Sequence, residues 1–289
     1  MTEKSTRKRK MGDTEETAPK KPAAKWPLIK PKKNLQISHL LDFDLFSVII
    51  PSSSFGFQFF NSILIAFFMV SSNSVEILMF QNKLNSASIV NVQNFFSSAE
   101  SKAFVKIAEE IGFAHQGSRG GEAYRDNDRI SVDDPVLADT IWESGLSKLF
   151  SDIKIRGKVA VGLNPNVRFY RFVSLYVRYK VGQRFGRHFD ASVDLGDGKR
   201  TYYTLLVYLS GGPGELKSKP KNDSSNPSVS SVDPLVGGET VFYGRRNKTV
   251  APTEGTALLH LHGDKCFLHE ARNVTKGVKY VFRSDAVFA

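Results

Sequence analysis

The sequence predicts a mainly β domain with flanking helices, of the α+β class. From Asn164 onward, short β-branched and aromatic runs alternate with Gly, Asp and Pro turns, as in an antiparallel sandwich or barrel. Before that point, two stretches place apolar residues at helical spacing. A chain of 289 residues can bury a sizeable core, which favours one folded domain with a tail.

Residues 1–34 are predicted to be a disordered basic tail. Residues 1–33 hold eleven Lys/Arg and four Asp/Glu, so they supply most of the net charge of +11. Their Lys-, Pro- and Ala-rich composition cannot bury enough surface to offset the entropy of ordering. Basic clusters at 7–10 and 20–21 have the spacing of a bipartite nuclear import signal, with a solvating tail as the alternative. The same charge permits contact with nucleic acid.

The cysteine content bounds the compartment and the metal chemistry. Cys266 is the single cysteine of the sequence. It excludes an internal disulfide framework and a cysteine-based zinc site, and it fits a reducing compartment. Together with the basic clusters, this favours a nuclear or cytoplasmic protein.

Residues 35–91 are interpreted as the start of the domain plus a hydrophobic insertion at about 49–91. Residues 45–75 contain no charged residue, but the nearly apolar part, 55–70, is short for the roughly twenty residues of a membrane helix. We favour a disordered insert or an unspliced segment. A membrane or peripheral anchor and a genuine part of the core remain alternatives, and a membrane span would exclude a nuclear location.

Two helices are predicted in the first half of the domain. In the first, over 97–112, Ser97 and Glu100 form a capping box, and Gly112 suits the C-terminal stop. A glycine-rich loop follows and holds a run of charged residues up to Arg129. The second helix is predicted over about 135–150, where apolar residues again recur at helical spacing.

The predicted domain spans 92–289. Its second half is predicted to be built of strands. The candidate strands are 167–172, 176–180, 201–209, 239–243, 256–262 and 279–288. Residues 168–172 and 176–180 are near duplicates, which indicates a second insertion of about eight residues. Residues 217–233 are rich in Ser, Lys, Asn and Pro and predict a mobile loop.

A His-x-Asp motif is the candidate centre of the chemistry. In a strand, residues two apart point to the same face, so His188 and Asp190 can aim an imidazole and a carboxylate at one point. A histidine from a distant strand, His269, would complete the 2-His-1-carboxylate face that leaves open positions on non-haem Fe(II). His260 and His262 are competing ligands, but the alternation around them favours a core-edge strand.

The residues around this motif add a recognisable order. Tyr-x-x-Gly-x-x-Phe begins at Tyr179, Gly-Gly-Glu-Thr occupies 237–240, and Gly-Val-Lys ends at Lys279, ten residues after His269. The pattern resembles the Fe(II)/2-oxoglutarate-dependent dioxygenases, specifically the prolyl 4-hydroxylase-like branch. The resemblance covers most of 92–289 and has no counterpart at 49–91 or around 172–179. It implies a double-stranded β-helix, or jelly-roll, core.

The resemblance also implies roles for single residues. The two histidines and the aspartate would hold Fe(II), and Lys279 would pair with the distal carboxylate of 2-oxoglutarate. Tyr208 matches the tyrosine that hydrogen-bonds the same carboxylate. Tyr179 matches an aromatic residue lining the cosubstrate pocket, with Tyr170 as its equivalent if the insertion displaces it. Arg283, on the same strand face as Lys279, is the reserve cation.

The implied reaction couples decarboxylation of 2-oxoglutarate, to succinate and CO2, with hydroxylation of an unactivated C–H bond by O2. Ascorbate is implied as the reductant that maintains the iron. We expect a protein side chain as substrate, with peptidyl proline first. The loop that can cover the mouth of the site either selects substrate or is a solvated charged loop: Arg119, Arg125, Asn127 and Arg129.

Two other functions remain open at this point. One is an oxygenase acting on nucleic acid, which would need a base-flipping pocket with aromatic stacking near the site. The other is a non-catalytic nuclear jelly-roll binding protein with a degenerate site. The intact set of candidate ligands with Lys279 argues against the second.

Overall fold

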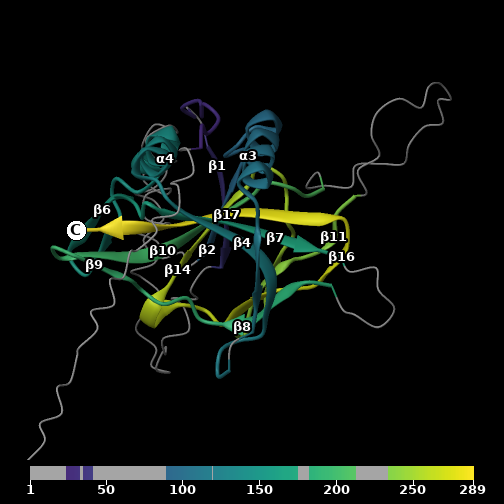
Figure 1. Ribbon diagram of the computed structural model, residues 1–289. Helices are drawn as coiled ribbons and strands as arrows, with labels where there is room; N and C mark the ends of the chain where they lie inside the picture. Colours follow the sequence, from purple (N-terminus) through teal and green to yellow (C-terminus); the bar gives the residue numbers. More distant parts are fainter. Residues whose placement is uncertain (1–23, 33–34, 42–88, 119, 175–181, 213–233) are drawn as a thin grey trace, which may run out of the picture.

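The structure is a computed structural model that describes residues 24–32, 35–41, 89–118, 120–174, 182–212 and 234–289 (Figure 1). Several predicted features lie outside these ranges: the two basic clusters, the apolar stretch 45–75, the strand 176–180, the loop 217–233, Arg119 and Tyr179. Among the helices that are described, none is both long and apolar enough to cross a membrane.

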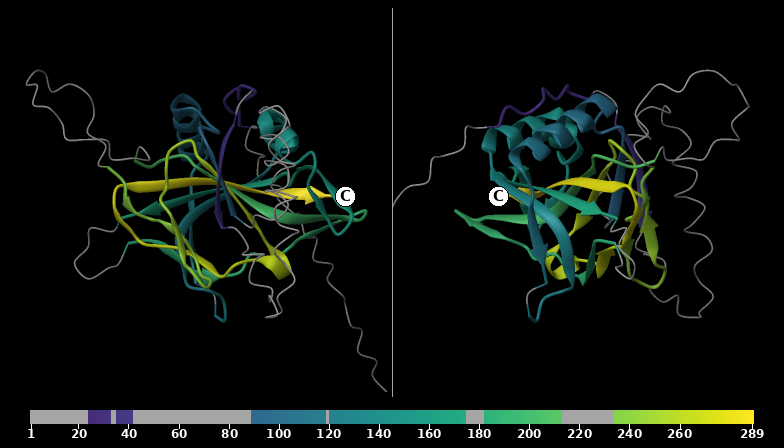
Figure 2. Two further views of the ribbon diagram at one scale, coloured as in Figure 1. Left: turned by 180° about the vertical axis from the view of Figure 1, so that it is seen from behind. Right: turned by 45° about the vertical axis from the view of Figure 1, so that its right-hand side comes forward.

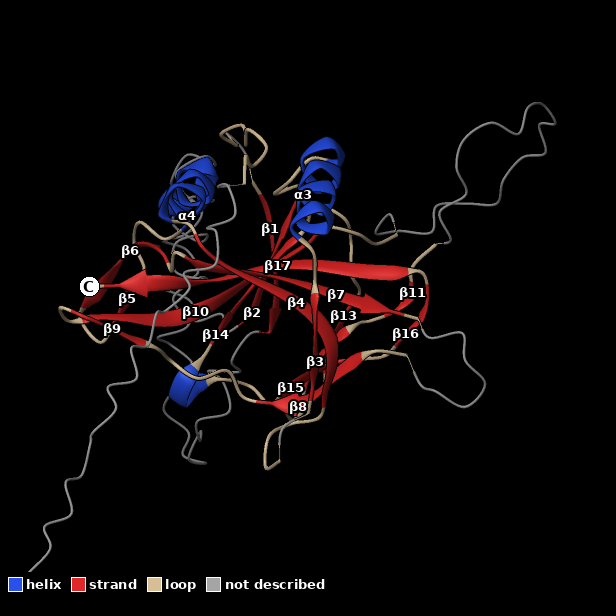
Figure 3. Cartoon of the chain, in the orientation of Figure 1, coloured by secondary structure: helices blue, strands red, loops and turns tan. Residues whose placement is uncertain are grey.

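One large, curled antiparallel sheet forms the body of the domain (Figure 3). Its strands, in spatial order, are β1 (Gln36–Leu41), β2 (Ile89–Gln93), β14 (Ala257–Leu261), β10 (Lys199–Tyr208), β17 (Val278–Phe288), β7 (Asn166–Val173), β4 (Arg125–Asp133), β8 (Arg184–His188), β15 (His269–Ala271), β12 (Thr240–Phe242) and β13 (Lys248–Val250). This mainly β architecture confirms the predicted class.

Shorter strands extend the edges of this sheet. They are β3 (Ala114–Gly117) on β4, β9 (Asp194–Gly196) on β10, β6 (Lys158–Leu163) on β17 and β5 (Lys154–Ile155) on β6. A separate pair joins β11 (Val236–Gly237) to β16 (Val274–Lys276). Of the predicted strands that fall in the described ranges, all are present with bounds shifted by one or two residues.

The helices lie together over one face of the long strands (Figures 1 and 2). Helix α3 (Ser98–Ile111) begins with the predicted capping box of Ser97 and Glu100. The second predicted helix consists of α4 (Pro135–Ile141), the π-helical turn η2 (Trp142–Leu146) and α5 (Ser147–Leu149). It bends at Gly145, whose φ of 149° is a backbone conformation that residues with a Cβ rarely adopt. A short 3-10 turn, η3 (Gly263–Lys265), follows β14.

Strand periodicity divides the interior into two cores. On β17, Phe282, Ala286 and Phe288 face the helices, whereas Val281 joins the second core on the opposite side. The same alternation runs through β10 and β14. The second core includes Tyr170, Phe172, Tyr208, Phe242, Val250, Leu258, Val274 and Val281.

The predicted end of the tail at residue 34 needs correction, because residues 24–32 belong to the folded domain. The Trp26 ring stacks on Phe169 with centroids 5.0 Å apart, and its indole N–H donates to Asp134 at 2.8 Å. Ile29 is buried in the helix-covered core. These two large apolar side chains help to anchor the segment in spite of its basic composition.

The predicted loop that contains Arg125 and Arg129 is wrong from Arg125 onward. These residues form β4, which pairs with β3, β7 and β8. Ile130 packs in the helix-covered core, and Arg125 and Arg129, odd-numbered on the same strand, face away from it. The density of charge concealed this alternation, since Ile130 and Val132, near the end of the strand, are the two apolar side chains on the inner face.

Two connections outside the described residues begin and end at paired positions. Leu41 and Ile89 are register partners in the antiparallel pair β1–β2, so the chain leaves and re-enters the sheet at one place. At the other, Gln183 N–H donates to the Val173 carbonyl, and the Gln183 side chain accepts from Val173 N–H. That these connections are insertions stays a prediction.

Candidate metal centre

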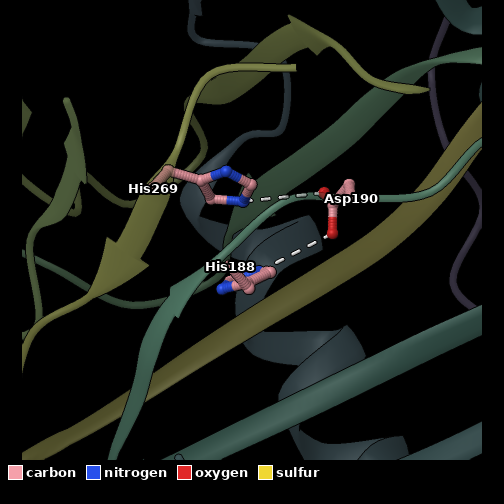
Figure 4. Close-up of side chains that lie close together, drawn as sticks. All are labelled: His188, Asp190 and His269. Carbon is pink, nitrogen blue, oxygen red and sulfur yellow. Dashed lines mark ion pairs between the residues drawn. The ribbon is translucent and has the colours of Figure 1, made fainter. Parts of the chain in front are cut away.

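Three side chains from two separate segments converge on one point (Figure 4). His188 ends β8, Asp190 follows two residues later, and His269 begins β15, where it is the register partner of His188. The Asp190 carboxylate lies 3.6 Å from Nε2 of His188 and 3.7 Å from Nε2 of His269. One potential ligand atom from each residue lies within 4.8 Å of the others. We call these three residues the triad.

Backbone carbonyls orient both imidazoles of the triad. Nδ1 of His188 lies 2.8 Å from the Gly186 carbonyl oxygen, and Nδ1 of His269 lies 2.8 Å from that of Phe267. Since a carbonyl only accepts, each Nδ1 carries the proton and each Nε2 presents a lone pair. The Phe185 ring stacks on His188 at 3.7 Å and fixes the plane of that imidazole.

The protonation states of the triad suit a metal ion. Burial, with a further contribution from His269, lowers the pKa of His188 to about 4. Burial also lowers the pKa of His269. Burial raises the pKa of Asp190, but the Arg283 guanidinium and the neighbouring imidazoles together outweigh it and hold that pKa well below its usual range. At neutral pH the triad therefore offers two neutral imidazoles and one carboxylate, the donor set of a non-haem Fe(II) site.

A hydrogen-bonded chain holds the Asp190 carboxylate in place. Thr204 Oγ1 donates to Oδ2 at 2.9 Å, and Nδ1 of His262 lies 3.0 Å from the same hydroxyl. Nε2 of His262 lies 3.0 Å from Thr201 Oγ1. Arg283 Nη1 donates to Oδ1 of Asp190 at 3.0 Å. Both carboxylate oxygens are thus fixed from behind, which orients a ligand as outer partners do in metal sites.

The sequence predicts a core-edge strand for His260 and His262, and the structure buries both. They also contact the site: Nε2 of His260 lies 3.6 Å from Asp190 Oδ2, and its ring meets that of His269 edge-on at 4.8 Å. Thr204 on β10 is the register partner of His260 on β14. In the sequence, the visible signal is a polar residue within each of two apolar runs; that the two residues face each other depends on strand register.

An inner cavity connects the triad to the predicted cosubstrate residues. All three members of the triad line it, together with Tyr170, Phe172, Phe185, Leu206, Thr240, Ala271, Lys279, Val281 and Arg283. Lys279, Val281 and Arg283 are alternate residues of β17, so one strand face carries both cations into the cavity.

The Lys279 ammonium is buried in this cavity, and no carboxylate of the described residues contacts it. Nζ donates to the Gly238 carbonyl oxygen at 2.6 Å and lies over the rings of Phe172 and Tyr208, at 5.3 and 5.4 Å. Burial lowers the pKa of Lys279 to about 7. Gly238 has a φ of 73°, and a Cβ there would lie 3.0 Å from the Lys279 side chain. The Gly-Gly-Glu-Thr segment therefore makes room for the ammonium.

The other predicted cosubstrate residues differ in position. Tyr208 is fully buried beside the cavity, with its hydroxyl 2.8 Å from Thr240 Oγ1. Tyr170, the alternative to Tyr179, lines the cavity. Arg283 also lines it, and its guanidinium is engaged by Asp190 and, at 3.4 Å, by Asp285.

The predicted substrate residues are only partly brought together. Arg125 and Arg129 line a larger, outer cleft that also contains His188 and Asp190. Asn127 is completely buried, and its side-chain amide donates to the Asp128 carbonyl. Asn127 is therefore not one of the described residues that line that cleft.

Comparison with known proteins identifies the fold. No family model and no curated protein matches the sequence. The chain is similar in structure to a prolyl hydroxylase from Trichoplax adhaerens in complex with a hypoxia inducible factor oxygen degradation domain peptide fragment. The TM-score is 0.50 at 15% identity, over 75% of this chain and 94% of that one. This likeness confirms the predicted double-stranded β-helix, or jelly-roll, fold.

Two further solved structures were found at lower TM-scores. The viral collagen prolyl hydroxylase from Paramecium Bursaria Chlorella virus-1, in a 2OG complex, gives 0.45 at 20% identity, over 70% of this chain and 96% of that one. A prolyl-4-hydroxylase from Pseudomonas putida gives 0.44 at 15% identity, over 72% and 96%.

Proposed function

We propose that the protein is an Fe(II)- and 2-oxoglutarate-dependent dioxygenase that hydroxylates a side chain of a protein or peptide. The observation that carries this proposal is the inner cavity, because the triad and the buried Lys279 both line it. A buried cation without a carboxylate in contact is costly, and it favours a ligand that brings its own negative charge. A keto dicarboxylate that also reaches a metal supplies that charge.

The triad would hold the ferrous ion. Its donor set fits the ion because both Nε2 lone pairs are free and the carboxylate is ionised. When bound, the iron would supply the activation of O2 that is coupled to decarboxylation of 2-oxoglutarate. The chain itself keeps Asp190 aligned through Thr204 and Arg283, so no ligand has to reorient on binding.

Lys279 would bind the distal carboxylate of 2-oxoglutarate. Its ammonium has three N–H donors, and Gly238 accepts from one of them. Phe172 and Tyr208 wall the ammonium off from water, which strengthens its attraction to an anion. Tyr208 reaches the same region through Thr240, whose hydroxyl it contacts.

A peptide is the substrate class we favour, with proline as the first residue to test. The hydroxylase from Trichoplax adhaerens was captured with a peptide fragment, and its fold is the one found here. The outer cleft beside His188 and Asp190 has a volume of about 460 Å³, which is of the size that binds small ligands and single residues of a chain. Ascorbate belongs in the assay as the reductant of the iron.

The test is succinate formation by the purified protein with Fe(II), 2-oxoglutarate, O2 and ascorbate. We expect wild-type protein to release succinate and His188→Ala to lose that activity, because two ligands do not retain the ion. Iron titration under nitrogen should show one site in the wild type and a loss of affinity of about a hundredfold in the variant.

His115→Ala is the matched control. This imidazole contacts Asp128 and is 61% exposed, away from the triad. It should leave both succinate release and iron affinity unchanged. Equal succinate release by wild type and His188→Ala would remove the metal assignment.

A further inference from the structure

The outer cleft carries an unusual concentration of arginine beside the triad. It is lined by four arginines: Arg125, Arg129, Arg168 and Arg283. It also contains His188 and Asp190, so a molecule bound there lies next to the metal ligands. The charges on its walls therefore bear directly on which substrate reaches the site.

Two of the four arginines are neutralised by acids of the fold. Arg283 contacts Asp190 at 3.0 Å and Asp285 at 3.4 Å. Arg168 lies 3.7 Å from the second oxygen of Asp285. Burial lowers the pKa of Arg283, but these two carboxylates outweigh it and raise that pKa. Both guanidinium groups are therefore held in ion pairs within the protein.

The other two arginines, Arg125 and Arg129, have no acidic partner within the described part of the chain. They lie on the same face of β4. Arg125 lies over the Phe185 ring at 4.4 Å, and its buried Nε has no hydrogen-bond partner among the described residues. Of the lining acids, Glu122 is the one that no arginine holds, and it is exposed at the rim.

An apolar rim completes the cleft. Phe189, which lies between His188 and Asp190 in the sequence, is 64% exposed, and Val193 is 38% exposed. Both line the cleft and add apolar surface to the charged surface of the arginines. A bound chain would thus meet both guanidinium groups and apolar surface within one cleft.

We propose that this cleft selects an acidic peptide, in which an Asp or Glu near the hydroxylated residue pairs with Arg125 and Arg129. Arginine presents a planar fork that matches a carboxylate, which gives direction as well as charge. The apolar rim would take a neighbouring uncharged side chain. This inference rests on the proposed function, because it takes the peptide residue that lies beside Asp190 to be the one that is hydroxylated.

Two of the three Phe and Tyr rings that line the cleft, Tyr170 and Phe185, are already stacked on other rings, which favours a peptide over a nucleobase. A flipped base needs a free ring face inside the pocket. His188 stacks on Phe185 at 3.7 Å and Arg125 lies over the same ring, so neither face is open. Tyr170 stacks against Phe172. Phe189 stands at the exposed rim, where it suits contact with a chain.

The experiment is a binding titration of full-length protein with fluorescein-labelled peptides, followed by fluorescence anisotropy. Three peptides of one Pro-containing sequence carry Glu, Gln or Lys beside the proline. We expect the Glu peptide to bind wild type about tenfold more tightly than the Gln peptide, and the Lys peptide to bind most weakly. Rising salt should erase much of this preference.

Variants of the two unpaired arginines sharpen the test. Arg129→Gln and Arg125→Gln should each weaken the Glu peptide about tenfold and leave the Gln peptide nearly unchanged. Arg129→Glu should reverse the preference toward the Lys peptide, which a misfolded variant cannot do. The control is Arg246→Gln, an equal loss of charge at an exposed arginine outside the cleft lining.

The outcomes separate the inference from the proposed function. Equal binding of the Glu and Gln peptides, or an equal loss in Arg246→Gln and Arg129→Gln, would overturn the acidic-peptide inference. Arg129-dependent binding of a single-stranded oligonucleotide that displaces the Glu peptide would overturn it in favour of nucleic acid. Peptide binding needs neither iron nor turnover, so a failure of the proposed function shows separately, as absent succinate.

Discussion

At the residue scale, the Lys279 side chain shows how a fold can hold a charge in readiness for a ligand. The ammonium is buried among Gly238, Phe172 and Tyr208, and burial lowers its pKa to about 7. Below that pH the group is protonated and can pair with a carboxylate; above it the group is neutral. A dianionic ligand favours the protonated form, so binding takes up a proton near neutral pH.

We therefore expect the Kd for 2-oxoglutarate to rise as the pH increases from about 6 to about 8, through the pKa of Lys279. Lys279→Met should weaken binding by about tenfold or more and remove this pH dependence. Calorimetric titration under nitrogen with Fe(II) measures both. Lys199→Met, an exposed lysine on β10, is the control. A pH-independent Kd in the wild type would contradict the role of Lys279.

At the scale of elements, Glu100 joins the start of α3 to the N-terminal segment 24–32. Its carboxylate accepts from Ser97 N–H at 2.7 Å, from Lys30 N–H at 3.0 Å and from Lys32 Nζ at 2.9 Å. Burial raises the pKa of Glu100, but the Lys32 ammonium and these backbone donors outweigh it and lower the pKa to about 2. One side chain thus caps a helix and fastens a separate segment to it.

The lowered pKa of Glu100 predicts a loss of stability in acid. Since the folded pKa of about 2 lies below the unfolded value of 4.5, the contribution is present above pH 4.5 and is lost as the pH falls toward 2. It amounts to at most about 3 kcal/mol, and to less after solvent screening of the pair. Urea unfolding at neutral pH should show Glu100→Gln destabilised by an amount of that order.

The difference between wild type and Glu100→Gln should then shrink between about pH 4.5 and pH 2. Glu110→Gln, an exposed glutamate on the same helix, should change the free energy of unfolding by less than about 0.5 kcal/mol. A constant difference across the acid range would show that the carboxylate charge of Glu100 is not the stabilising element.

At the scale of the whole molecule, the sheet closes around the site without needing the stretch between β1 and β2. Leu41 and Ile89 are paired across these strands. Strand β2 in turn pairs with β14, which carries His260 toward Asp190. Antiparallel neighbours can be joined by a short turn, so nothing in the described sheet requires a long connection here.

Replacing residues 42–88 by a short Gly-containing turn should therefore leave the fold intact. We expect the same circular dichroism, a Tm within a few degrees of the wild type, and retained succinate formation. Removing β1 as well should lower the Tm further, because it exposes the edge of β2. A variant that unfolds on loss of 42–88 alone would show that this stretch belongs to the core.

The predictable part of the fold follows from local signals. The capping box at Ser97 and Glu100 gave the start of α3, and the alternation along 279–288 gave β17. Local signals failed where charge hid the pattern, as in β4, and where two apolar residues anchored a basic segment, as Trp26 and Ile29 do. A burial partner elsewhere in the chain decided these segments.

By itself, the sequence determined the class of fold and which residues were candidates for chemistry, because strand periodicity, turn composition and motif spacing are local properties. Only the tertiary structure decided that His269 meets His188 across a strand pair and that His262 and Thr204 support Asp190. It also decided which arginines pair with a carboxylate among the described residues. Pairing register and burial depend on segments far apart in the chain, and no local pattern contains them.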